Sequence, residues 1–202
     1  GINAISIREN DELLEAKLTD GNNQIMIAAK GGKAIRFHES NVRAMGRTAS
    51  GVRGNRLDKK DEAIGMVIVA DTANDTILVV SEKGYGKRTD VEDYRETNRG
   101  GKGVITLNIT EKTGNLIALK NVTDENDLMI INKSGVTIRT SVSALRVMGR
   151  ATQGVKLINL KSDDEIAAVA KVEIEHNEDL NEEDLNEENE NSIKSDNFNE
   201  EE

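Results

Sequence analysis

The sequence predicts an all-β, propeller-like fold built from four-stranded repeats of about 50 residues. A Gly-Val pair recurs at 51, 103 and 154, in steps of 52 and 51 residues, and Gly1-Ile2 lies 50 residues before the first pair. Within each step, short runs of aliphatic and β-branched residues alternate with turn residues. Because only 2% of the residues are aromatic, we expect a core of Ile, Val, Leu and Ala packed between stacked sheets.

The recurring glycines divide the chain into repeat units. We expect full units at 1–50, 51–102 and 103–153, and a partial unit at 154–172. A single unit cannot bury both faces of its sheet, so the units must stack on one another as blades. Because the chain begins with Gly rather than Met, we expect it to be a piece of a longer protein, with an incomplete set of blades.

Four strands are expected in each unit, in a constant order. The first strand directly follows the glycine, at 2–7, 52–57, 104–109 and 155–160. The second is an apolar run after a turn, at 11–18, 61–70, 114–122 and 164–172. The third strand lies at 24–29, 76–81 and 128–133. A glycine-containing turn then leads to a short fourth strand and an arginine.

The formal net charge of −10 is unevenly distributed along the chain. Residues 173–202 hold 14 of the 37 acidic residues and one of the 27 basic residues, which leaves 23 acidic and 26 basic residues in the rest. This segment is rich in Asn and Glu and too poor in apolar groups to offset chain entropy. We therefore expect a mildly basic repeat body at 1–172 and a disordered acidic tail at 173–202. The tail either solubilises the protein or competes with the ligand of the body.

Arginines recur at fixed positions when the units are aligned on the fourth strand. Nine of the twelve arginines fall into three columns, the second and third lying seven and eleven residues after the first. The first column is Arg36, Arg88 and Arg139, the second is Arg43, Arg95 and Arg146, and the third is Arg47, Arg99 and Arg150. Further positive charge lies beside them at Lys87, Lys102 and Lys156.

Two interpretations of these columns stay open. Stacked blades place equivalent residues at regular angular steps, so the arginines can form a basic track for phosphate groups. A regular track without an aromatic platform favours the backbone of duplex DNA over single-stranded bases. On this interpretation all nine arginines and the three lysines are candidate DNA contacts. Alternatively the arginines, above all the first column, join blade to blade by pairing with carboxylates.

Three blocks of the sequence resemble a known family. The blocks AIRFHESNVRAMGRTASGVRG, GYGKRTDVEDY and VTIRTSVSALRVMGR are similar, in order and spacing, to the C-terminal domain of bacterial DNA gyrase A subunits. The resemblance covers residues 1–172 and implies a β-pinwheel, a propeller-like disc of about six blades. It further implies that the disc wraps DNA around a basic rim and so supports ATP-dependent negative supercoiling by a type IIA topoisomerase. The regular repeats and the acidic tail favour gyrase over the similar domain of topoisomerase IV.

One motif departs from the family pattern. The signature heptapeptide of the family, Gln-Arg-Arg-Gly-Gly-Lys-Gly, is matched at five of seven positions by TNRGGKG at 97–103. We interpret this stretch as a degenerate copy in a later blade, with the true motif upstream of Gly1. Arg99 and Lys102, with the glycines, then carry over as contacts to the DNA backbone. We expect this fragment to bind DNA without wrapping it fully.

The sequence contains no recognisable catalytic constellation. Its two histidines lack partners at metal-binding spacing and it has no Cys, so we expect no metal, cofactor or active site in this fragment. The resemblance implies that ATP and Mg²⁺ are used elsewhere in the holoenzyme. It also implies three partners, which are double-stranded DNA, the B subunit of gyrase and a second A subunit.

The compartment and the alternative functions follow from what the sequence lacks. No membrane-length apolar run or signal peptide is present, so we expect a cytoplasmic protein without a membrane partner. The alternative function is a propeller that serves as a protein-interaction platform. A propeller hydrolase is a weaker third interpretation, because the sequence offers no convergent set of acid and base groups.

Overall fold

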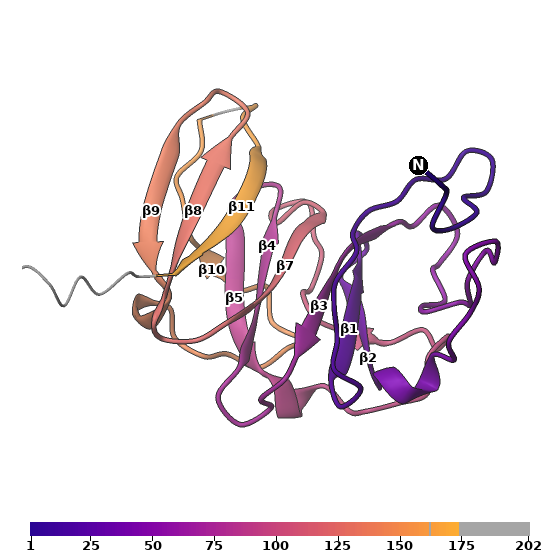
Figure 1. The fold of residues 1–202 in the computed structure, drawn as a ribbon. Helices are drawn as coiled ribbons and strands as arrows, with labels where there is room; N and C mark the ends of the chain where they lie inside the picture. The colour runs from indigo at the N-terminus through magenta and orange to yellow at the C-terminus, as the bar shows by residue number, and fades with distance from the viewer. Residues whose placement is uncertain (162, 174–202) are drawn as a thin grey trace, which may run out of the picture.

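The computed structural model describes residues 1–161 and 163–173, which form antiparallel β-sheets joined by short connections. Three sheets lie side by side and are numbered here in chain order (Figure 1). In this part of the chain the helical elements are single 3-10 turns, each directly after a β-hairpin. They are η1 (Glu39–Asn41), η2 (Val91–Asp93) and η3 (Val142–Ala144). The all-β class is therefore confirmed.

The sheets share one plan, with a hairpin at the centre and a later apolar strand on one edge. Sheet 1 has the order β3-β1-β2-β6, formed by β1 (Gln24–Ala29), β2 (Lys33–His38), β3 (Ala63–Val69) and β6 (Val104–Ile105). Sheet 2 has the order β10-β5-β4-β7, formed by β4 (Thr76–Ser81), β5 (Tyr85–Asp90), β7 (Leu116–Val122) and β10 (Val155–Lys156). Sheet 3 has the order β11-β8-β9, formed by β8 (Asn126–Asn132), β9 (Thr137–Ser141) and β11 (Ile166–Glu173).

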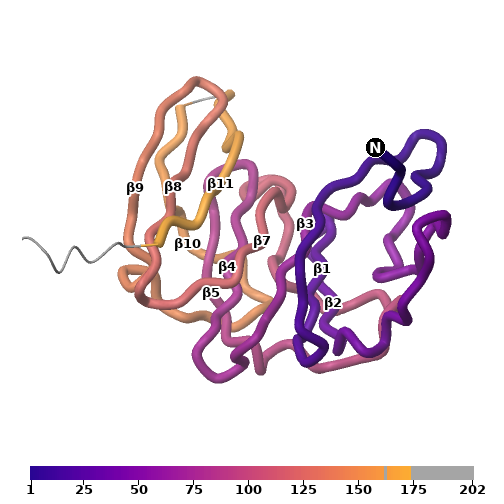
Figure 2. The backbone as a smooth tube through the Cα atoms, in the orientation of Figure 1, coloured from indigo at the N-terminus to yellow at the C-terminus, as the bar shows by residue number. Residues whose placement is uncertain are grey.

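After η2 and η3 the chain crosses to the preceding sheet. Residues 97–105 leave sheet 2 and run beside β2, where the Thr97 amide donates to the Arg36 carbonyl oxygen (2.9 Å) and β6 pairs with the start of β2 (Figure 2). The chain then returns to sheet 2 as β7. Residues 148–156 repeat this path beside β5 and end in β10. Neighbouring sheets are thus linked by the chain itself as well as by packing.

Two glycines make the crossing possible. Gly103 and Gly154 have φ angles of 73° and 75°, a left-handed conformation that side chains disfavour. A Cβ at Gly103 would collide with the backbone of Ala34, and one at Gly154 would collide with the backbone of Gly86. The recurring glycine seen in the sequence therefore marks a close approach of two backbones.

The strands group differently from the expected units, although the repeat period is as predicted. Sheet 1 takes β1 and β2 from the expected unit 1–50, β3 from 51–102 and β6 from 103–153. The boundaries that we placed at the glycines fall inside the crossing, because the short strand after each glycine pairs with the preceding blade. The partial unit 154–172 likewise divides, since β10 joins sheet 2 and β11 joins sheet 3.

Several expected strands are shorter or missing. The first strands at 104–109 and 155–160 reduce to the two-residue strands β6 and β10, and those at 2–7 and 52–57 are irregular, as is the second strand at 11–18. In later units, the segments equivalent to 2–7, 52–57 and 11–18 pair with a hairpin that comes earlier in the chain. The described residues contain no earlier hairpin with which these three segments could pair. The other predicted second, third and fourth strands are present in all three sheets.

The central strand β4 connects two hydrophobic cores. All of its residues are buried, and side chains of a strand alternate between the two faces. Ile77 and Val79 pack in the core between sheets 1 and 2, whereas Leu78 and Val80 pack in the core between sheets 2 and 3. Each of these side chains contributes on the order of 1.5–3 kcal/mol to folding. Sheet 2 is therefore the element that both cores share.

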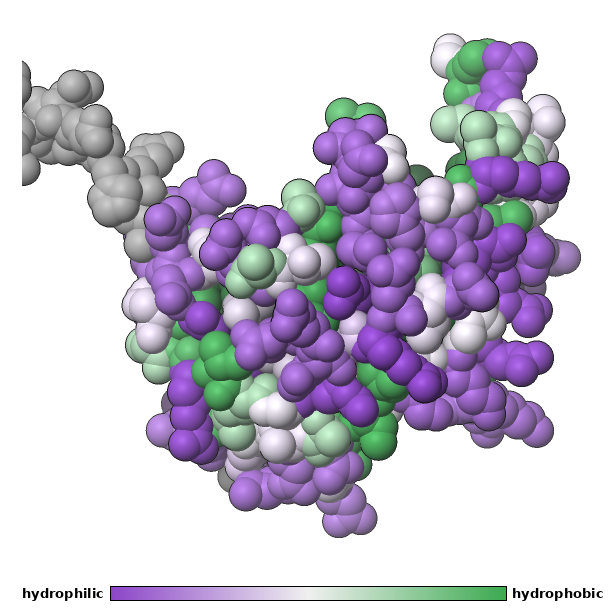
Figure 3. All heavy atoms as spheres, turned by 90° about the horizontal axis from the view of Figure 1, so that it is seen from below, coloured by the Kyte–Doolittle hydropathy of each residue, from purple (hydrophilic) through white to green (hydrophobic). Residues whose placement is uncertain are grey.

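Outside these cores the surface is mostly polar. Seen from below, hydrophilic residues cover most of the visible face, and the apolar areas between them are small (Figure 3). A third, smaller core of Ile25, Ile35 and Phe37 lies on the face of sheet 1 that is turned away from sheet 2. The expected acidic tail, apart from Glu173 at the end of β11, lies outside the described residues.

Candidate nucleic-acid interface

Three crossing segments carry the second and third arginine columns. We define them as residues 43–51, 95–103 and 146–154, each of which begins directly after the residue that ends a 3-10 turn. The second and third segments run along the edges of sheets 1 and 2, next to β2 and β5. The fold thus brings the repeated basic positions to equivalent places on successive blades.

The arginines of the second column are exposed at equivalent places of the three crossing segments. The side chains of Arg43, Arg95 and Arg146 are exposed and make no hydrogen bond or ion pair with another residue that the structure describes. The preceding residue ends the 3-10 turn in an extended conformation, and in sheet 2 it is the fully buried Tyr94. Because side chains alternate in extended backbone, the next residue points outward. These three guanidinium groups are free to bind an external anion.

The third column ties the second and third crossing segments to earlier parts of the chain. The Nε atom of Arg99 donates to the carbonyl oxygen of Asn41 (2.9 Å), and its Nη1 atom donates to that of Arg53 (3.0 Å). The Asn41 carbonyl belongs to η1, so the bond joins the segment to the blade before it. Two of the five N–H donors of the guanidinium are used in this way, and three remain for other partners.

Arg150 repeats these contacts one blade further on. Its Nε atom donates to the carbonyl oxygen of Asp93 (3.1 Å) and its Nη1 atom to that of Ile105 (3.0 Å). Arg47 is exposed, because no blade precedes it in the described part of the chain. The third column therefore serves blade stacking, and its remaining N–H groups are available at the edge.

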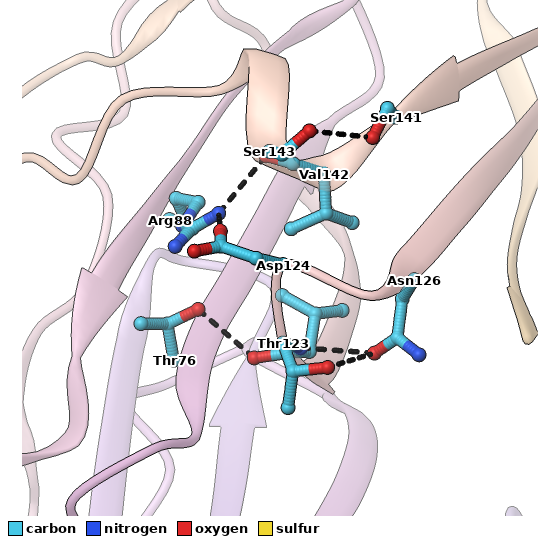
Figure 4. A network of polar contacts seen from close by, with 9 residues as sticks. Thr76, Arg88, Thr123, Asp124, Asn126, Ser141, Val142 and Ser143 are labelled. Atoms are coloured by element: carbon cyan, nitrogen blue, oxygen red, sulfur yellow. Dashed lines mark hydrogen bonds and ion pairs between the residues drawn. The ribbon is translucent and has the colours of Figure 1, made fainter.

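Arg88, of the first column, is buried between sheets 2 and 3. Its side chain is 8% exposed, and its Nη1 atom donates to the carbonyl oxygen of Val142 (2.9 Å) and to Oδ1 of Asp124 (2.5 Å), as Figure 4 shows. The backbone amide of Thr123, next to Asp124, donates to Oδ1 of Asn126 (2.9 Å), which fixes the turn that carries the carboxylate. The structure thus places Arg88 as a link between blades rather than on an open DNA-binding track.

Arg36 makes the equivalent link from sheet 1 to sheet 2. Its Nη1 atom donates to the carbonyl oxygens of Val91 and Tyr94 (3.0 Å each), at η2. Arg139, at the same position of sheet 3, has no following blade among the described residues and is instead exposed beside Asp127, with Nε–Oδ2 at 2.6 Å. Arg36 and Arg88 thus match the alternative in which the first column joins blade to blade. The difference is that most of their partners are backbone carbonyls rather than carboxylates.

Lys87 is buried beneath a crossing segment, contrary to the expectation of an exposed contact. The residue is 1% exposed, and Nζ donates to the carbonyl oxygens of Gly149 (2.6 Å), Arg150 and Thr152 (3.2 Å) and to the Thr152 hydroxyl (3.0 Å). Burial, and to a smaller extent the nearby positive charge of Arg150, lower the pKa of Lys87 to about 8, while Asp93 opposes the shift. The inward direction of the Lys87 side chain follows from strand alternation, because Arg88 next to it points to the other face.

Lys102 and Lys156 lie at the outer edge, where an anion can reach them. Lys102 is exposed, and its ammonium lies 3.9 Å from Asp58, which also binds the ammonium of Lys33. The bond and the charge of Lys33, together with the charge of Lys102, lower the pKa of Asp58. Lys156 is exposed in β10, opposite Tyr85.

A group of lysines around Tyr85 was not anticipated from the sequence. Tyr85 lines a shallow pocket of about 370 Å³, and the ammonium of Lys112 lies 5.2 Å from the centre of its ring. The other lysines that line this pocket are Lys83, Lys156 and Lys161. They come from β10 and from separate loops and occupy no common column, so the repeat alignment carries no signal for them as a group.

The described residues offer no other site chemistry. They include no group of three or more His, Cys, Asp or Glu side chains placed to hold a metal ion. Within the same ranges, no helix has the length and apolar character needed to cross a membrane. The repeated basic edge is therefore the feature that best defines a candidate functional site.

Comparison with known proteins agrees with this arrangement. The family model of the DNA gyrase C-terminal domain, a β-propeller, matches residues 23–70, 75–123 and 126–173. Each matched range contains a hairpin and the later apolar strand of one sheet, which supports the sheets as the repeating units.

Relatives and solved structures give the same result. The A subunit of DNA gyrase from Staphylococcus aureus strain NCTC 8325 is 48% identical over 179 residues, which are 89% of this chain and 20% of the relative. That of strain MRSA252 is 48% identical over 176 residues, 87% of this chain and 20% of the relative. The chain thus spans about a fifth of the length of these relatives.

Among solved structures, the DNA gyrase A C-terminal domain superposes with a TM-score of 0.77 at 25% identity, covering 85% of this chain and 58% of that one. The C-terminal domain of DNA topoisomerase IV has a TM-score of 0.79 at 22% identity, covering 84% of this chain and 53% of that one. The predicted propeller-like pinwheel fold is confirmed by these superpositions.

Proposed function

Because the chain belongs to the DNA gyrase C-terminal domain family, we propose that it binds the backbone of duplex DNA through its crossing segments, as part of a DNA gyrase A subunit. The observation that carries this proposal is the second arginine column. Arg43, Arg95 and Arg146 are exposed and unpaired at equivalent places of the described repeats. Lys102, Lys156 and the remaining N–H groups of Arg99 extend the same basic edge.

The chemistry of this edge suits phosphate groups. A guanidinium binds two oxygens of one phosphate at once, and its charge does not depend on pH in the physiological range. The described part of the chain has one partly exposed aromatic residue, Tyr85, so stacked single-stranded bases have little to pack on. We therefore infer binding of the duplex backbone with little sequence preference.

We infer the role of the parent protein from the relatives. A domain that holds DNA against a type IIA topoisomerase supports ATP-dependent negative supercoiling by presenting one DNA segment to another. The B subunit of gyrase, a second A subunit, ATP and Mg²⁺ belong in this proposal to the rest of that assembly. An equivalent domain of topoisomerase IV is the second candidate, since its fold is as similar, but the 48% identity to gyrase A subunits favours gyrase.

The test is duplex binding by fluorescence anisotropy over a series of salt concentrations. We expect steep salt dependence, with log K falling by about 0.9 per phosphate contact for each decade of salt. The triple variant Arg43→Gln, Arg95→Gln, Arg146→Gln should weaken binding and lower the slope by about 2 to 3. These side chains have no partners in the described structure, so the thermal stability should stay the same.

A matched control separates this edge from net charge. The triple variant Arg8→Gln, Lys59→Gln, Lys60→Gln removes the same charge from exposed residues outside the crossing segments. It should change the slope far less than the arginine variant. Equal losses in both variants, or a folded wild-type chain that does not bind duplex DNA, would contradict the proposed edge and favour the protein-interaction platform.

A further inference from the structure

Lys87 occupies a repeat position that is apolar in the other units. The alignment that places the first arginine column in register puts Ile35 and Ile138 at the same position. Ile35 is 1% exposed, as is Lys87, so an ammonium group stands where the repeat otherwise places core. A buried ammonium is costly unless its charge is compensated. Here three carbonyl oxygens and one hydroxyl of the crossing segment provide that compensation.

This contact fixes the orientation of three peptide groups. The carbonyls of Gly149, Arg150 and Thr152 point to the ammonium, and the peptide bonds of the described residues are trans. In a planar trans peptide the C=O and N–H bonds point in opposite directions. The N–H groups that follow these carbonyls, those of Arg150, Ala151 and Gln153, are therefore directed away from the ammonium and toward the outside of the segment.

The outward amides lack partners within the described structure. The backbone bond made inside this loop is the one from the Thr152 amide to the Gly149 carbonyl, and none starts from the amides of Arg150, Ala151 or Gln153. Ala151 is exposed, and Arg150 and Gln153 are partly exposed. The exposed Arg146 and Lys156 flank the segment, so its surroundings are positively charged. Outward N–H groups in a basic environment are suited to oxygen anions.

We propose that residues 150–153 form a backbone phosphate-binding site, in which the amides of Arg150, Ala151 and Gln153 donate to the DNA backbone and Lys87 positions them from beneath. This inference rests on the proposed function and names one site on the proposed DNA-binding edge. It also assigns a role to Lys87 that the arginine columns do not, since the lysine acts through the loop and touches no DNA.

The charged groups around Lys87 are Arg150 in the crossing segment and Asp93 in η2. The pKa of about 8 means that Lys87 loses its proton at a moderately alkaline pH. A neutral amine has two N–H donors instead of three, so it cannot satisfy all of the converging oxygens. The amides should then lose their fixed orientation, and DNA affinity should fall between about pH 7 and pH 9.

The experiment combines NMR with binding measurements on the wild-type chain and on Lys87→Met. Methionine has a similar length and is apolar, as the other units are at this position. Titration of ¹⁵N-labelled protein with a duplex of about 20–30 bp should shift the amide signals of Arg150, Ala151 and Gln153. In Lys87→Met these shifts should shrink, and affinity at pH 7 should fall by about threefold to tenfold, the equivalent of about one hydrogen bond. Its affinity should no longer depend on pH between about 7 and 9.

Two comparisons separate positioning from folding. Ile35→Met makes a similar change beneath the segment 97–103 and should leave DNA affinity unchanged. The folded-state pKa of Lys87 lies below its ordinary value of 10.5, so the unfolded chain binds more protons between about pH 8 and 10.5 and this group makes the fold more stable as pH rises. Affinity that falls while the melting temperature holds or rises cannot reflect unfolding.

The outcomes are distinct. Tight, salt-dependent binding with no shift of the three amides, or with an unchanged pH profile in Lys87→Met, would overturn this inference and leave the proposed function intact. A wild-type chain that folds but does not bind duplex DNA would overturn both. If Lys87→Met does not fold, the amide shifts and the pH profile of the wild-type chain alone decide, and both must be present.

Discussion

The crossing segments beside sheets 1 and 2 follow the same path but are supported differently. The segment 95–103 has three glycines, lies over the apolar Ile35, and carries its own lysine, Lys102, facing solvent. The segment 146–154 has fewer glycines and lies over Lys87, which is buried. Both segments expose a second-column arginine, but one also presents a lysine outward, whereas the other lies over a buried lysine and presents backbone amides. The comparison teaches that a repeat can keep one path while it changes how that path contacts an anion.

The largest effect should come from the glycines that both segments share. Gly103→Ala and Gly154→Ala each force a side chain into a left-handed conformation and against the backbone of the neighbouring strand. We expect each to lower the free energy of unfolding by about 2–4 kcal/mol, measured by denaturant titration. Gly149→Ala is the control, because its Cβ has nothing within 4 Å. A harmless Gly103→Ala beside a severe Gly154→Ala would show that the two paths are not equivalent.

A smaller effect should follow from the third-column arginines. Arg99→Met and Arg150→Met each remove two bonds to backbone carbonyls of earlier parts of the chain. We expect each to cost about 1–3 kcal/mol in the free energy of unfolding, and both to weaken DNA binding. Thermal unfolding and anisotropy of the two variants check this. Loss of binding without loss of stability would assign these arginines to DNA contact alone.

The smallest effect should arise at Asp58, which competes with DNA for the positive charge of Lys102 in the segment 95–103. Asp58→Asn removes the carboxylate next to Lys33 and Lys102, so we expect duplex affinity at low salt to rise by about twofold. The gain should disappear at high salt, because exposed charges are screened. Glu125→Gln, at an exposed turn between sheets 2 and 3, should have no such effect. An unchanged affinity in Asp58→Asn would mean that Lys102 does not contact DNA.

Much of the fold was predictable because its signals are local. The period of about 50 residues, the hairpins and the later apolar strands follow from spacing, alternation and glycine positions. The two-residue strands β6 and β10 were overestimated, since their length depends on how far they run beside another blade. Residues 2–7 and 11–18 have strand-like patterns but no strand to pair with among the described residues.

The candidate site was predicted in part. Equal spacing identified the arginine columns, but spacing does not tell whether a neighbouring blade covers a position. Arg36 and Arg88 are covered, while Arg43 and its equivalents are not. A signal for Lys87 was present in the register, because a lysine in a column of isoleucines suggests a buried charge with a specific partner. The partner itself could not be predicted, since it comes from the backbone of a loop 62 residues away.

The sharing of β4 between two cores has a consequence for how this molecule opens. Since opposite faces of one strand hold the two cores together, sheet 2 cannot detach without exposing both, whereas sheets 1 and 3 can fray singly. Amide hydrogen exchange should then be slowest in β4 and grow faster toward either end of the array. Such a gradient gives a stiff middle with compliant ends, so the array can change its curvature at its ends without melting as a whole.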